Sequence, residues 1–121
     1  MIDKIMVKKM SFQEAIKLAE DIIERFEKIE GRKWGAEGSL IELQKQVGEL
    51  SKLIMVREKY YFSDTDKIDE QYEINKDKIA DELADVLYAI IRLAKHYNID
   101  LEKGHLDARK AEDDFLKSKG I

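Results

Sequence analysis

Residues 83–91 read LADVLYAII, and this stretch decides the fold class. Eight of its nine residues are apolar or tyrosine, and the ninth is Asp85. A helix that is apolar on all sides packs against neighbours on several of them, because it offers no face to water. The stretch therefore predicts a helix, over about residues 76–97, that contributes to the internal core and also to a subunit interface.

The rest of the chain has the composition of a helical protein. It has 121 residues, no proline and 40% charged residues, with many glutamates, lysines, leucines and alanines, which are strong helix formers. The apolar periodicity predicts further helices over about residues 12–30, 40–60 and 101–119. Ser11 with Glu14, and Ser39 with Glu42, have the spacing of N-terminal capping boxes. We expect one all-α domain over residues 1–121, a bundle of about four helices.

Several protein classes are excluded by composition. The chain has no cysteine, so it has neither a disulfide nor a thiolate metal site. No apolar run approaches the roughly 18 residues of a membrane span, and residues 1–10 lack the apolar centre of a signal peptide. The net charge is −4, with both signs interspersed. We therefore expect a cytoplasmic protein that binds neither membrane nor nucleic acid.

Carboxylates in apolar surroundings are the candidate functional groups. Glu82 and Asp85 lie one turn apart on the expected 76–97 helix, and a buried charge must be protonated, paired or bound to a metal. On the 40–60 helix Glu49 follows Gly48, and a glycine inside a helix is best understood where another element packs closely. If the two helices face each other, Glu49, Glu82 and Asp85 could converge. Their hard oxygens suit Mg²⁺ or Mn²⁺.

A plainer interpretation of the same residues stays open. With 26 Asp and Glu in 121 residues, carboxylates three apart arise by chance, so Glu82 and Asp85 taken alone would be a surface pair. Glu42 is then a capping residue, and Trp34 is a core anchor rather than a platform for a base. What favours a functional role for Asp85 is its apolar surroundings, not its spacing.

At these residues the chain resembles the MazG superfamily of all-α nucleotide pyrophosphohydrolases. The resemblance covers about residues 34–115: a tryptophan loop at Trp34, QVGELSKLI at 46–54, DELADVLYAIIRLAKHYNIDL at 81–101, and a final helix. It implies hydrolysis of a nucleoside triphosphate to a monophosphate and pyrophosphate. It also implies Mg²⁺, with Mn²⁺ as the alternative ion, held by the carboxylates of an ExxE and an ExxD motif. Relatives form homodimers or homotetramers of helical bundles.

The resemblance assigns roles residue by residue. Glu49 matches the second ExxE carboxylate, and Glu82 with Asp85 matches the ExxD pair, so these three are the candidate catalytic and metal-binding residues. The candidate substrate-binding residues are Trp34, Gln46, Arg109 and Lys110.

Two departures from the family pattern bear on activity. Gln46 stands where the first ExxE glutamate belongs, which removes one negative charge from the expected metal site. In the final helix many relatives have a Lys and an Asn that contact phosphates, and Ala108 and Glu112 stand there. A two-residue shift would instead place Lys110 and Asp114 at those positions.

Two hypotheses follow from this mixture of matches and departures. The chain is either a Mg²⁺-dependent pyrophosphohydrolase with weakened activity, or a catalytically degenerate relative that acts as a nucleotide-binding or assembly module. A coiled-coil adaptor is less favoured, because no strict heptad is sustained. The spacing between the two motifs is long, so residues 56–75 are expected to be partly an insertion.

Overall fold

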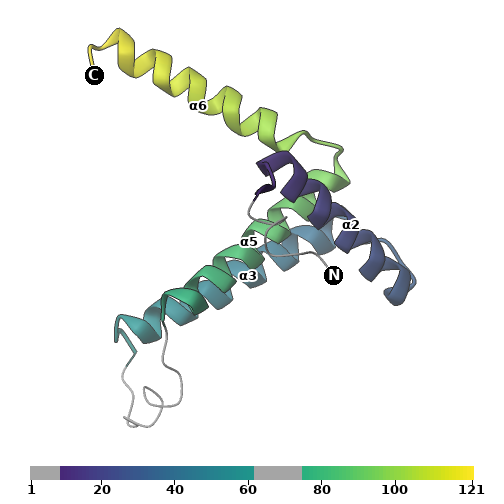
Figure 1. The fold of residues 1–121 in the computed structure, drawn as a ribbon. Helices are drawn as coiled ribbons and strands as arrows, with labels where there is room; N and C mark the ends of the chain where they lie inside the picture. The colour runs from purple at the N-terminus through teal and green to yellow at the C-terminus, as the bar shows by residue number, and fades with distance from the viewer. Residues whose placement is uncertain (1–8, 62–74) are drawn as a thin grey trace. The chain divides into compact units, whose positions relative to one another are not determined.

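The computed structural model describes residues 9–61 and 75–121. The described residues hold four α-helices and no strand: α2 (Phe12–Glu30), α3 (Ala36–Arg57), α5 (Lys76–His96) and α6 (Leu101–Ser118) (Figure 1). The predicted all-α fold class is thus confirmed for this part of the chain. The four helices also lie within a few residues of their expected ranges.

Local side-chain chemistry explains where α2 begins and ends. The Ser11 hydroxyl accepts a hydrogen bond from the Glu14 backbone N–H at 3.1 Å, and the Glu14 carboxylate accepts one from the Ser11 backbone N–H at 3.4 Å. This reciprocal pair is the predicted capping box, which is confirmed. Gly31 ends the helix with a φ of 76°, a left-handed conformation that glycine adopts without a Cβ clash.

The second predicted capping box is wrong. α3 begins at Ala36 with Gly35 as its N-cap, so Ser39 lies inside the helix. Ala36 and Glu37 are good helix formers, and the Glu37 carboxylate stabilises the positive end of the helix. These two residues extend the helix ahead of Ser39, and its hydroxyl is therefore not needed as a cap.

The remaining helix ends also follow from single residues. α3 ends at Arg57, before the expected residue 60, and Lys59 then takes a left-handed φ of 59°. Asn75 Oδ1 accepts from the Lys78 backbone N–H at 3.0 Å at the start of α5. Asp100 Oδ1 does the same for Lys103 at the start of α6, also at 3.0 Å. Residues 62–74, most of the expected connection and insertion, lie outside the described residues.

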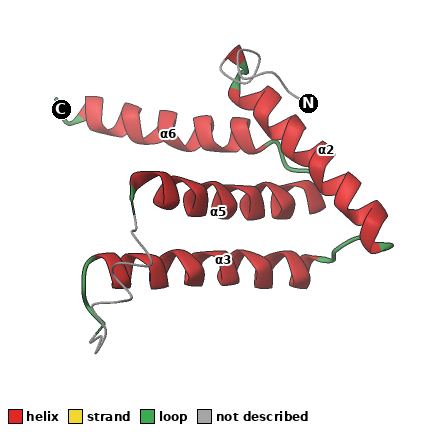
Figure 2. Cartoon of the chain, turned by 60° about the horizontal axis from the view of Figure 1, so that its bottom comes forward, coloured by secondary structure: helices red, strands yellow, loops and turns green. Residues whose placement is uncertain are grey.

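The chain forms two compact units. The hairpin unit, described residues 34–61 and 75–90, pairs α3 with the larger part of α5, and these helices run side by side in opposite directions (Figures 1 and 2). The terminal unit consists of described residues 9–33 and 91–121, and holds α2, the end of α5 and α6. The expectation of one domain over residues 1–121 stays a prediction.

Among the described residues of each unit only a few apolar side chains are buried. In the terminal unit Ile16, Ile23 and Ile91 are buried, and Ile16 and Ile23 share one face of α2 because they are seven residues apart. An ion pair between Lys95 and Glu24, at 3.4 Å, also joins α5 to α2. In the hairpin unit Ala89 is the buried apolar residue among those described.

Candidate functional site

The hairpin unit carries every carboxylate that the two motifs supply. On α3, Glu42, Gln46 and Glu49 follow one another at four- and three-residue spacing, which places them along one face. On α5, Asp81 and Asp85 are four residues apart and therefore also lie along one face. The Glu42, Gln46 and Glu82 side chains are half-buried, whereas Glu49 and Asp85 belong to exposed residues.

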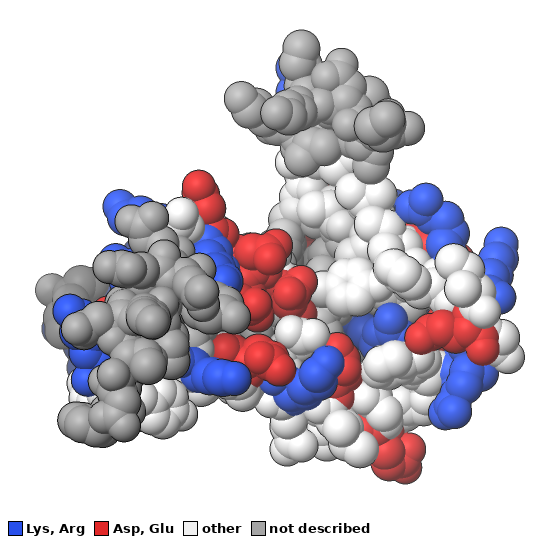
Figure 3. Space-filling view, turned by 90° about the horizontal axis from the view of Figure 1, so that it is seen from below, with Lys and Arg blue, Asp and Glu red and all other residues white. Residues whose placement is uncertain are grey.

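Asp85 is the carboxyl group whose surroundings are most perturbed. Its pKa is raised above the ordinary value of 3.8, first by partial burial and then by the negative charges of Asp81 and Glu42. Asp81 lies one turn before it on α5, but Glu42 belongs to α3, so carboxylates of both helices act on the same group. Figure 3 shows acidic side chains gathered on one face of the molecule. We call Glu42, Asp81 and Asp85 the acidic cluster.

The apolar neighbours of Asp85 in the sequence predict that its carboxylate is buried, and this prediction is wrong. The residue is exposed in the single chain, and Leu83 and Leu87 on the same helix keep 52% and 41% of their surface exposed. A helix with apolar residues on all sides still exposes some of them when neighbouring elements cover only part of its surface. Water therefore screens the repulsion on Asp85, and the rise in its pKa reflects partial desolvation.

Gln46 is held by a neighbouring carboxylate. Its Nε2 donates a 2.8 Å hydrogen bond to Glu42 Oε1, one turn earlier on α3. The residue at the first ExxE position therefore adds no negative charge, and its amide stabilises the Glu42 carboxylate by a hydrogen bond. The Glu42 carboxylate therefore accepts from Gln46 and does not have the capping role that its spacing predicts.

The expected metal-binding residues are not assembled into a ready site. Across residues 9–61 and 75–121, no three His, Cys, Asp or Glu side chains converge closely enough to hold a metal ion. The chemistry of the donors suits Mg²⁺, because Glu49, Glu82 and Asp85 offer only hard oxygens. Their geometry in the single chain does not bring them around one point.

Gly48 does not mark a close helix contact. A Cβ built at Gly48 would meet no described atom within 4 Å, so the close packing that we expect there is absent from the described part of the chain. α3 and α5 nevertheless run side by side (Figures 1 and 2), and after partial burial and Asp81 the charge of Glu42 on α3 also raises the pKa of Asp85 on α5. Glu42 and Asp81, which the motif assignment does not include, are the charged residues that raise the pKa of Asp85 in addition to its partial burial. Their four-residue spacing from Gln46 and Asp85 is the signal that could have revealed them.

Trp34 stands directly before α3 in the hairpin unit. The residue is half-buried, and its ring carbon Cε3 lies 3.8 Å from the position that a Cβ on Gly38 would take. The indole therefore lies over the first turn of α3, at the side of a residue without a side chain. This position is compatible with the plainer interpretation of Trp34 as a packing residue.

The two basic candidates lie on α6, in the terminal unit. Arg109 Nε donates to Glu112 Oε1 at 2.9 Å, and Lys110 Nζ pairs with Asp114 Oδ2 at 3.1 Å. These are exposed pairs within one helix, which contribute little to stability and separate easily. Arg109 and Lys110 are therefore available to an anionic ligand only by exchanging these partners. Their helix belongs to a different unit from the acidic cluster.

Comparison with known proteins gives no match: no protein-family model, no curated protein and no solved structure matches this chain. The resemblance to the MazG superfamily therefore stays a prediction, based on the residues quoted above. In the part of the chain that the structure describes, no helix is long and apolar enough to cross a membrane.

Proposed function

We propose that the chain is a Mg²⁺-dependent nucleoside triphosphate pyrophosphohydrolase with weakened activity. The observation that carries the proposal is the placement of carboxylates on two helices that run side by side, α3 and α5 (Figures 1 and 2). Partial burial, then the charge of Asp81, and then the charge of Glu42 from α3 raise the pKa of Asp85. Carboxylates that repel one another across two facing helices favour a cation between them. The triphosphate substrate and the MazG-like fold come from the resemblance of the two motifs that these helices carry.

The motif residues divide the work between metal and substrate. Glu49, Glu82 and Asp85 would hold Mg²⁺ through their carboxylate oxygens. Bound there, the ion would supply a Lewis acid that activates water and offsets the charge of the triphosphate. Trp34 is proposed to stack on the base, and Arg109 and Lys110 to contact phosphate oxygens after leaving their present partners.

Gln46 explains why the activity is proposed to be weak. Affinity for a divalent cation rises with the number of charged ligands, and a neutral amide contributes one charge fewer than a glutamate. In this chain the amide nitrogen also engages Glu42, which draws a further carboxylate into a local hydrogen bond. The first effect lowers the negative charge that faces a cation, and the second occupies a carboxylate oxygen that could otherwise bind the cation.

Assembly through α5 belongs to the same proposal. Leu83 and Leu87 are large apolar side chains with about half of their surface exposed, at 52% and 41%. We infer that a second copy of the chain covers them, in a homodimer or homotetramer. Such an interface could also bring carboxylates of two chains together, which would complete a site that one chain leaves open.

Release of pyrophosphate is the direct test of this function. Standard and modified nucleoside triphosphates are screened with Mg²⁺ and with Mn²⁺, using the unmodified chain, Glu82→Gln and Glu58→Gln. Glu58 is an exposed carboxylate at the C-terminal cap of α3, so its substitution removes the same charge away from the motifs. We expect metal-dependent release that Glu82→Gln abolishes and Glu58→Gln leaves unchanged. Metal-independent release, or equal loss in both variants, contradicts the proposal.

A second candidate is a nucleotide-binding or assembly module that no longer catalyses hydrolysis. One observation favours it, the hydrogen bond from the Gln46 amide to the Glu42 carboxylate. This bond gives both polar groups a partner without a metal ion. Equilibrium dialysis with the same nucleotides separates the two candidates. Binding without pyrophosphate release supports the module, whereas binding with metal-dependent release supports the enzyme.

A further inference from the structure

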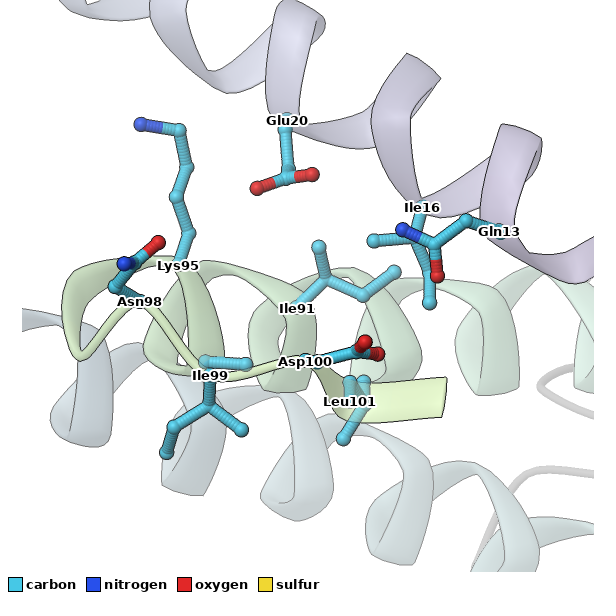
Figure 4. Close-up of a pocket in the computed structure, with 10 residues that line it drawn as sticks. Gln13, Ile16, Glu20, Ile91, Lys95, Asn98, Ile99, Asp100 and Leu101 are labelled. Carbon is cyan, nitrogen blue, oxygen red and sulfur yellow. The ribbon is translucent and has the colours of Figure 1, made fainter. Parts of the chain in front are cut away.

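The terminal unit contains a pocket of about 230 Å³ that the proposed function does not use. It lies between α2, the last turns of α5 and the start of α6 (Figure 4). Ile16, Ile91, Ala94 and Leu101 supply apolar wall, and Ile16 and Ile91 are buried. Half of the lining residues are polar, so a ligand here would place a short hydrocarbon part against these side chains and its polar atoms against the rest.

Three charged side chains line the pocket, and two of them already have partners. Lys95 Nζ pairs with Glu24 at 3.4 Å, and Asp100 Oδ1 accepts from the Lys103 backbone N–H at 3.0 Å. Glu20 is the third. Its half-buried carboxylate extends from α2 toward α5 (Figure 4), and among the described residues no group hydrogen-bonds to it or pairs with it.

The charge of the lining selects the charge of a ligand. Two carboxylates and one ammonium give the lining a net charge of −1, and the ammonium of Lys95 is already paired with Glu24, which lies outside the lining. Of the two carboxylates, Asp100 accepts a backbone hydrogen bond, whereas Glu20 accepts none from a described group. The Glu20 carboxylate is free to accept a charge-assisted hydrogen bond, so a single positive charge placed beside it is stabilised. The Gln13 amide, which lines the same face of α2, offers an additional oxygen acceptor.

We propose that this pocket binds a small organic amine, whose ammonium group pairs with Glu20 and whose hydrocarbon part lies on Ile16, Ile91 and Leu101. The size of the pocket agrees with this class, since a cavity of about 150 Å³ accommodates benzene. The pocket is independent of the pyrophosphohydrolase proposal, because every residue that lines it belongs to the terminal unit.

Titration of the full chain with isopentylamine, followed by amide chemical shifts in NMR, tests the proposal. The variants are Glu20→Gln and Asp21→Asn, which each remove one carboxylate charge from neighbouring positions on α2. Asp21 does not line the pocket and pairs with Arg25 at 2.9 Å, so it is the matched control. We expect shifts at Ile91, Ala94 and Leu101 in the unmodified chain, unchanged affinity in Asp21→Asn, and about tenfold weaker binding in Glu20→Gln.

Two further probes test the proposal on the unmodified chain alone, so the test does not depend on whether the variants fold. Isopentanol has the same shape without the charge, and ammonium chloride has the charge without the hydrocarbon, so both should bind the unmodified chain far more weakly. A lysine-containing tripeptide shows whether the amine comes as a free molecule or as a side chain. Equal binding of isopentanol, equal loss in both variants, or binding of the tripeptide alone would overturn the proposal of a small-amine site.

Discussion

Gln46 and Glu42 are joined by a 2.8 Å hydrogen bond from the Gln46 amide to a Glu42 carboxylate oxygen, one turn apart on α3. Glu42 in turn raises the pKa of Asp85 on α5. The position at which the sequence departs from its expected motif is therefore linked, through Glu42, to the carboxyl group whose pKa is perturbed. This link determines what changes at Gln46 and at Asp85 should do.

Gln46→Glu should strengthen metal binding, and without metal it should slightly lower the stability of the folded chain. The substitution replaces a hydrogen bond by two like charges four residues apart, which destabilises a helix by about 0.2–0.5 kcal/mol. The added charge should raise the affinity for Mn²⁺ and any release of pyrophosphate. Calorimetric Mn²⁺ titration, thermal melting and pyrophosphate release measure the three effects.

Gln44→Glu is the control for this prediction, because Gln44 is exposed on the same helix. It adds the same charge without the contact to Glu42, so it should change metal affinity much less. An equal response of the two variants means that Gln46 has no special position. Higher metal affinity without any hydrolysis would favour the nucleotide-binding module.

Asp85→Asn should stabilise the chain at neutral pH in the absence of metal. Because the folded-state pKa of Asp85 lies above 3.8, the folded chain binds this proton more tightly than the unfolded chain. The free energy of unfolding therefore falls as pH rises through the interval above 3.8, and the penalty is complete once pH exceeds the folded-state pKa. Denaturant melts of both proteins should differ at pH 7 and converge below pH ~3. A variant that is less stable at pH 7 would identify Asp85 as a structural hydrogen-bond acceptor.

Glu42→Gln should lower the pKa of Asp85 toward its ordinary value. Glu42 is one of the two charges that raise it, so loss of this charge removes part of the repulsion. NMR titration of the Asp85 side-chain carboxyl carbon measures the change directly. Glu37→Gln, in the first turn of the same helix, is the control and should leave the titration of Asp85 where it was.

The fold was predictable because its signals are local. The Ser11–Glu14 capping box and the apolar period of α2 lie within a few residues of one another, and both are confirmed. Ser39 and Glu42 have the same spacing but form no capping box. Ala36 and Glu37 also favour helix, so α3 begins before Ser39. A spacing rule cannot by itself show which of two competing starts a helix adopts.

The site was less predictable because it depends on the register of two helices. Amphipathic patterns favour contact between α3 and α5, but they do not fix how far one helix slides along the other. Glu42 rather than Glu49 therefore supplies the charge from α3 that acts on Asp85. The exposure of Asp85 depends on which element or second chain covers the other side of α5. The apolar residues of α5 alone do not identify that partner.

Ile23→Ala should be among the most destabilising single changes in α2. The side chain is 1% exposed, and removing it leaves a cavity in a small core, which costs about 2–5 kcal/mol. Ile29→Ala on the same helix is the control, because Ile29 is 83% exposed and should change stability by less than about 0.5 kcal/mol. Urea melts of the two variants give the difference, and similar losses would contradict the burial of Ile23.

Ser39→Ala should leave the chain as stable or make it more stable. The Ser39 hydroxyl is buried without a hydrogen-bond partner among the described residues, so its removal relieves an unsatisfied polar group. Ser51→Ala corrects for the higher helix propensity of alanine, because Ser51 is an exposed serine of α3 whose hydroxyl donates to Val47 at 2.8 Å. A loss of more than about 1 kcal/mol relative to Ser51→Ala would show that the Ser39 hydroxyl has a partner.

Leu87→Lys should dissociate the proposed oligomer. Leu83 and Leu87 remain 52% and 41% exposed on α5. Few apolar side chains are buried among the described residues, so stability increases when a second copy covers these two. A lysine at this position would be buried without a partner in the interface, which opposes association strongly. Light scattering at micromolar concentration should show a dimer or tetramer for the unmodified chain and a smaller or unfolded species for Leu87→Lys. Ile29→Lys adds the same charge at an exposed position of α2 and should leave the mass unchanged. A stable monomer of the unmodified chain at that concentration would rule out assembly through α5.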